Sequence, residues 1–87
     1  MYAKNSMIVD AGSKKISAIE IACDTYQNTI CNASGDVTCE GTNMTVAEAS
    51  LKASSINKSK ATILNTSTQT GTPSQIRMTK LIITYAE

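Results

Sequence analysis

Apolar and polar residues alternate over several short stretches of this chain. Residues 16–23 read Ile-Ser-Ala-Ile-Glu-Ile-Ala-Cys, which places Ile19, Ile21 and Cys23 on one face of an extended strand. Residues 7–10 are the expected partner strand, because the short polar segment between the two stretches contains glycine, as hairpin connections often do. The pattern predicts an antiparallel pair of strands near the start of the chain.

Two more strands are predicted in the last third of the chain. Residues 61–66 are rich in residues that favour strands, and residues 76–85 form the longest strand candidate. Within 76–85 the apolar positions change from one face to the other near Thr79 and Lys80, and Ile82 is left over. This change of phase predicts either a central strand covered on both faces or a β-bulge near these two residues.

The middle of the chain carries a helix-start signal. Thr45 and Glu48 have the spacing of a capping box and follow the apolar residue Met44. The next apolar positions are spaced by three or four residues, which predicts a helix over residues 45–57 with small residues on its apolar face. Leu51 falls on the opposite side of that helix and is expected to be exposed.

The segment 24–41 has two interpretations. Residues 29–31 and 37–39 suit two strands of a hairpin, whereas Asp24 could instead cap a short helix that ends at Gly35. We favour the hairpin because Asn, Thr and Cys are poor helix formers.

The order of these elements predicts an α+β fold. We expect a small, mostly antiparallel sheet of four to six strands, with one or two helices packed on one face. Residues 1–87 are expected to form a single domain, as the length indicates.

Large apolar side chains are few, which bears on assembly. The chain has ten Ile, three Val and three Leu but no Phe and no Trp. Sixteen such side chains make a small core for a chain of 87 residues, so its folding would gain from burial against a partner. Because the strand over 76–85 is apolar on both faces, we expect a second copy or a protein partner to cover one of them. The alternative is that the segment 24–41 folds back and covers this face. A homodimer is the first choice, with Met78 and Ile82 in or near the contact.

Several chemistries are excluded by what the sequence lacks. It contains no histidine, which removes Ser-His-Asp and Cys-His arrangements and most catalytic zinc sites. It also contains no glycine-rich phosphate-binding motif. We therefore expect no enzyme activity, no metal site and no cofactor. The net charge is +1 without a basic stripe, so no nucleic-acid partner is expected, and no apolar run approaches the length of a membrane helix.

The three cysteines are spaced by eight residues, unlike a C-x-x-C metal or redox motif. The favoured hairpin would place Cys31 opposite Cys39, where a disulfide is geometrically feasible, with Cys23 left over. The interpretation favoured for the three cysteines is nevertheless that they are buried, reduced thiols, with the Cys31–Cys39 disulfide as the alternative. No signal-peptide pattern stands at the start of the chain, so a cytoplasmic location is expected, with an extracellular one as the alternative.

Three functional hypotheses follow. The leading one is a non-enzymatic interaction module that binds a protein partner or assembles with itself. The second is an extracellular or surface structural subunit with a glycosylated exterior, because Ser and Thr are abundant and four glycosylation sequons begin at Asn32, Asn43, Asn57 and Asn65. The third is a small-ligand-binding protein that uses the Thr-rich loop 67–75. Its candidate binding residues are Thr68, Gln69, Thr70, Thr72 and Arg77.

Overall fold

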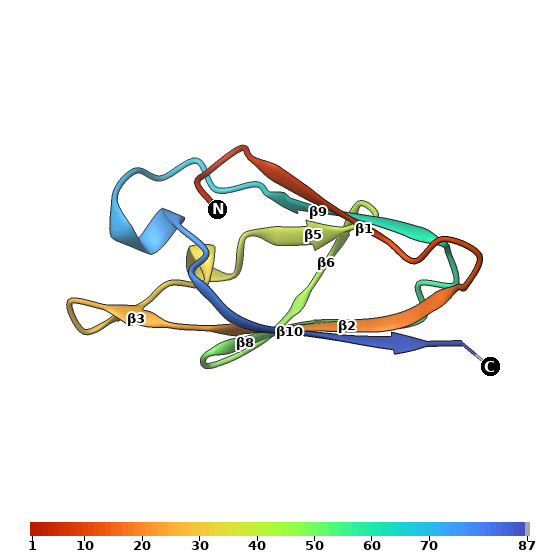
Figure 1. Ribbon diagram of the computed structural model, residues 1–87. Helices are drawn as coiled ribbons and strands as arrows, with labels where there is room; N and C mark the ends of the chain where they lie inside the picture. The colour runs from red at the N-terminus through yellow and green to blue at the C-terminus, as the bar shows by residue number, and fades with distance from the viewer. Residues whose placement is uncertain (87) are drawn as a thin grey trace.

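Two antiparallel sheets lie face to face in the computed structural model, which describes residues 1–86. Figure 1 shows them as two layers, one with the strand order β1-β9-β5-β6 and the other with the order β10-β2-β8-β7. A separate small hairpin is made by β3 and β4. The elements are β1 (Ser6–Asp10), β2 (Ile16–Cys23), β3 (Thr25–Tyr26), β4 (Thr29–Ile30), η1 (Ala33–Gly35), β5 (Val37–Cys39), β6 (Thr42–Asn43), β7 (Thr45–Ala47), β8 (Ser50–Ala53), β9 (Lys60–Asn65), η2 (Thr72–Ser74) and β10 (Met78–Tyr85).

The fold is a β-sandwich, and the predicted α+β class is wrong. No helix of seven or more residues occurs among residues 1–86. In place of the helix expected over 45–57, β7 and β8 form a hairpin that turns at Glu48, whose φ is 50°. Leu51, the misfit on the helix, is fully buried and lies opposite Ile21 of β2. Burial of Leu51 against β2 therefore decides this segment, and the capping-box spacing does not.

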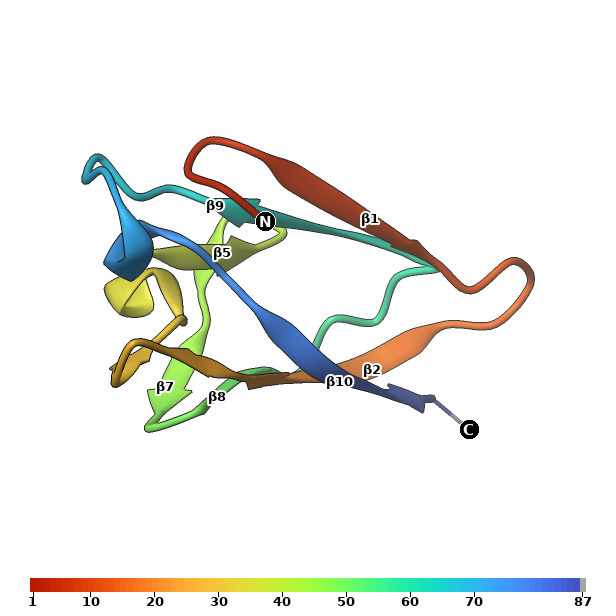
Figure 2. The ribbon, with the colours of Figure 1, turned by 60° about the vertical axis from the view of Figure 1, so that its left-hand side comes forward.

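The strand over 16–23 is confirmed, but its expected partner is wrong. β2 buries Ile19, Ile21 and Cys23 on the predicted face and pairs with β10 and β8. β1 pairs instead with β9 in the other sheet. The segment 11–15 crosses from one sheet to the other, as Figure 2 shows, so it closes one end of the sandwich and is not a hairpin turn.

The strands predicted at 29–31 and 37–39 occur as β4 and β5, but they do not pair with each other, and the alternative helix ending at Gly35 does not form. The two strands pair elsewhere: β4 with β3, and β5 with both β6 and β9. The only helical turn in the segment 24–41 is the three-residue η1. Cys39 therefore lies opposite Thr42 and Ile63 and not opposite Cys31. Within residues 1–86 all three cysteines are free and buried.

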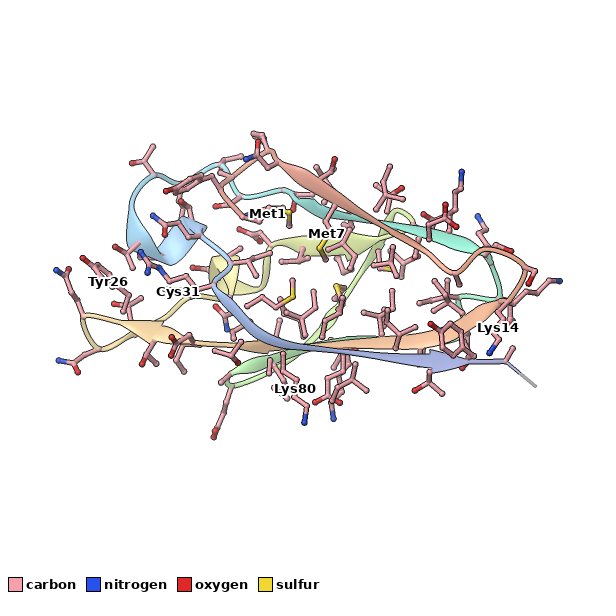
Figure 3. The ribbon with its side chains drawn as sticks, in the orientation of Figure 1. Met1, Met7, Lys14, Tyr26, Cys31 and Lys80 are labelled. Atoms are coloured by element: carbon pink, nitrogen blue, oxygen red, sulfur yellow. The ribbon has the colours of Figure 1, made fainter. Side chains whose placement is uncertain are left out.

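The core lies between the two sheets, where Figure 3 shows the inward side chains meeting. Three polar residues are buried beside this core, Asn65, Ser67 and Ser74, and Asn65, at the end of β9, is fully buried. Its Nδ2 donates to the carbonyl oxygen of Ser74 at 2.7 Å and to that of Met1 at 3.2 Å, and its Oδ1 accepts from the N–H of Ser67 at 3.1 Å. One amide thus fastens the Thr-rich loop and the first residues of the chain to the sandwich.

Candidate functional site

The strand β10 forms one edge of its sheet. Within the described part of the chain it pairs only with β2. The register shifts between Met78 and Lys80, which confirms the bulge predicted near Thr79 and Lys80, and it shifts again between Thr84 and Tyr85. The regular ladder therefore spans Lys80 to Thr84 and is bounded by an irregularity at each end.

The hydrogen bonds of β2 show which backbone groups of β10 are unpaired. Cys23 donates its N–H to Ala49, and Ser17 accepts from Ile56, so the odd-numbered residues of β2 bond toward β8. Within the regular ladder the even-numbered residues Ala18, Glu20 and Ala22 bond toward β10, where Glu20 lies opposite Ile82. Ile82, Lys80 and Thr84 thus bond to β2. The N–H and C=O groups of the residues between them, Leu81 and Ile83, point away from the sheet at its open edge.

Both faces of β10 carry apolar side chains. Leu81 and Ile83 are half-buried and pack against the core. On the outer face, Ile82 is 40% exposed. Ile82 lies opposite Glu20 of β2, and the residues two positions before and after Glu20 on the same face are Ala18 and Ala22. Because these alanines are small, they leave the side chain of Ile82 uncovered on the outer face. β10 thus combines unpaired backbone groups with apolar side chains above and below them.

The other sheet edges are shorter. β6 has two residues and β7 has three. The edge strand β1 has five residues, and it ends in Asp10, whose carboxylate accepts from the N–H of Gly12. Its outward residue Ile8 is 64% exposed. Short and charged edges discourage strand addition, so the eight-residue β10 is the edge most open to it.

None of the residues predicted to bind a ligand lines either of the two hollows beside β8. Thr68, Gln69 and Thr70 are exposed on the loop, and Thr72 is half-buried in η2. The guanidinium of Arg77 lies over the ring of Tyr26, 4.2 Å from its centroid, and the Arg77 Nε donates to the Gln75 side chain at 3.3 Å. Arg77 therefore helps to hold the β3–β4 hairpin, whose labelled Tyr26 lies at one end of the sandwich in Figure 3.

Two hollows flank β8. One, of about 390 Å³, is lined by Cys39, Glu40, Thr42, Asn43, Thr45, Lys52, Ala53, Ser54, Ser55 and Ile56. The other, of about 330 Å³, lies on the outer face of the sheet that contains β10. It is lined by Ala18, Ile19, Glu20, Thr45, Lys52, Ala53, Ser54, Ile82 and Thr84. The ion pair beside it, with Lys52 Nζ 4.0 Å from Glu20 Oε1, is exposed and contributes little to stability.

The pKa values of Glu40, Cys23 and Cys39 are shifted by hydrogen bonding and burial within the fold. The pKa of Glu40 is lowered because its carboxylate accepts from the N–H of Thr62 at 2.7 Å and from Lys58 Nζ at 3.2 Å. Burial raises the pKa of the Cys23 and Cys39 thiols, which keeps them protonated at neutral pH. Among residues 1–86 no group of three or more His, Cys, Asp or Glu side chains is arranged to hold a metal ion.

The sequons differ in accessibility. Asn65 is buried, and the Nδ2 of Asn32 donates to the carbonyl oxygen of Glu48 at 3.0 Å. Asn43 and Asn57 are exposed. Among the four sequon asparagines, Asn43 and Asn57 are therefore the most exposed, Asn32 is half-buried and Asn65 is inaccessible in the folded chain.

In the described residues, no helix has the length and apolar character that crossing a membrane would require. Comparisons with protein-family models, with curated proteins and with solved structures found no match to this chain.

Proposed function

We propose that this chain is a non-enzymatic interaction module that assembles with a second copy of itself through the edge of β10. The observation that carries the proposal is the eight-residue edge strand with unpaired N–H and C=O groups at Leu81 and Ile83. A sheet edge of this kind accepts another strand by continuing the hydrogen-bonded ladder. The exposed side chains of Met78 and Ile82 add apolar surface beside those groups.

The surroundings of the other candidate residues support this choice over ligand binding. Neither hollow is lined by the loop residues Thr68, Gln69, Thr70 or Thr72. Arg77 is occupied by Tyr26 and Gln75. The exposed apolar side chains of Met78 and Ile82 instead lie beside the unpaired N–H and C=O groups of Leu81 and Ile83, and an assembly surface combines such groups.

The mass in solution tests the proposal. An interface made from one strand of each copy lies at the small end of protein interfaces, where complexes are weak. Light scattering coupled to size exclusion should therefore be run from about 1 μM to about 1 mM, the range in which weak dimers form. We expect the mass to rise with concentration toward twice the chain mass of 9.2 kDa. A constant mass of one chain across this range would refute self-assembly.

A further inference from the structure

We infer that the two copies join by antiparallel pairing of their β10 strands about a two-fold axis at Ile82. This inference rests on the proposed self-assembly and gives its geometry. Only Leu81 and Ile83 direct backbone groups to the open edge inside the regular ladder. A second β10 must therefore place its own Leu81 or Ile83 opposite one of these two residues to form hydrogen bonds.

The two bulges select one register. Pairing about Ile82 sets Leu81 opposite Ile83 of the second copy, and Ile83 opposite its Leu81. All the free groups of the ladder are then used in four hydrogen bonds. Pairing about Leu81 would set Ile83 against Thr79 at the first bulge. Pairing about Ile83 would set Leu81 against Tyr85 at the second bulge. Both of these registers lose hydrogen bonds because bulges disrupt the ladder.

Charge and side-chain packing agree with this register. The ladder from Lys80 to Thr84 contains one charged residue, Lys80, which would lie opposite Thr84 of the second copy. The two lysines would be about 14 Å apart, four residues along a strand, beyond the screening length of about 8 Å at physiological salt. Ile82 would meet Ile82 on the outer face, while Leu81 and Ile83 would pack together on the core side. The result is a continuous eight-stranded sheet built from two four-stranded ones.

Disulfide trapping tests the register. We would prepare Ile82→Cys, Lys80→Cys and Thr84→Cys separately, in exposed positions where the fold tolerates the change. Each would be oxidised with oxidised glutathione at a concentration at which the wild type is dimeric. The wild type, whose own cysteines are buried, is the control. Facing residues of this pairing have Cα atoms about 4.5 Å apart, within disulfide range, whereas two copies of residue 80 are too far apart.

We expect Ile82→Cys to form a covalent dimer and Lys80→Cys alone to form none. A mixture of Lys80→Cys with Thr84→Cys should form a covalent heterodimer. The register is wrong, while self-assembly stands, if the unoxidised variants associate by light scattering and one of two results is found. Either Lys80→Cys cross-links to itself, or the mixture of Lys80→Cys with Thr84→Cys does not cross-link. If neither the wild type nor any variant associates, the proposed self-assembly fails and the register fails with it.

Discussion

Ile82→Lys is expected to weaken self-association by at least about tenfold in Kd, or about 1.4 kcal/mol. The substitution removes an exposed apolar side chain from the centre of the proposed contact. It also sets two lysines directly opposite each other, and like charges in facing positions of a ladder destabilise the pairing. Sedimentation equilibrium or light scattering over a concentration series measures the change. The free energy of unfolding should move by less than about 0.5 kcal/mol, because the side chain is at the surface.

Ile8→Lys is the matched control for this variant. Ile8 is also an isoleucine on the outer face of an edge strand, and it is more exposed than Ile82, but it lies on β1. Its replacement should leave the Kd of the dimer unchanged. If Ile8→Lys dissociates the dimer and Ile82→Lys does not, the assembly uses the β1 edge and the assignment to β10 is refuted.

Asn65→Ala is expected to lower the free energy of unfolding by about 3 kcal/mol. The buried amide makes three hydrogen bonds, and its loss leaves the carbonyl oxygens of Ser74 and Met1 and the N–H of Ser67 without this partner. A buried polar group left unpaired costs about 1 to 3 kcal/mol, so the combined loss exceeds that of one bond. Urea denaturation of the variant and the wild type measures the difference.

Asn43→Ala serves as the control for that measurement, because Asn43 is exposed on β6. Its unfolding free energy should lie within about 0.5 kcal/mol of the wild type. A loss below about 1 kcal/mol for Asn65→Ala would mean that water or neighbouring groups replace the amide, and that the loop is not held by it.

Strands in which apolar and polar residues alternate could be predicted from the sequence, but the strands with which they pair could not. The strands over 16–23 and 76–85 and the bulge near Lys80 follow from local side-chain pattern. Whether the last strand is central or at an edge depends on its pairing with β2, more than fifty residues earlier in the chain. Local pattern contains no information on such contacts, so the open edge itself could not be foreseen.

The helix predicted over residues 45–57 failed because the local pattern there is ambiguous and a tertiary contact decides between helix and strand. Val46, Ala49 and Ala53 have helical spacing, while Leu51 and Ala53 have the spacing of a strand. The apolar segment is too short for its periodicity to separate a helix from a strand. Burial of Leu51 against Ile21 decides the outcome, and that contact is tertiary. The role of Asn65 was missed for a similar reason, because its partners lie in a loop and at the start of the chain.

Amide hydrogen exchange at Leu81 and Ile83 tests the central claim most directly. Both N–H groups point to the open edge of β10 in one copy and would be hydrogen-bonded in the dimer, whereas the N–H of Ile82 bonds to β2 in either state and serves as an internal reference. Exchange would be followed at residue resolution in dilute and concentrated wild-type protein and in concentrated Ile82→Lys. The account predicts that Leu81 and Ile83 exchange at least about tenfold more slowly only in the concentrated wild type, because bonded amides exchange through opening. Equal exchange rates for these two amides in all three samples would contradict it.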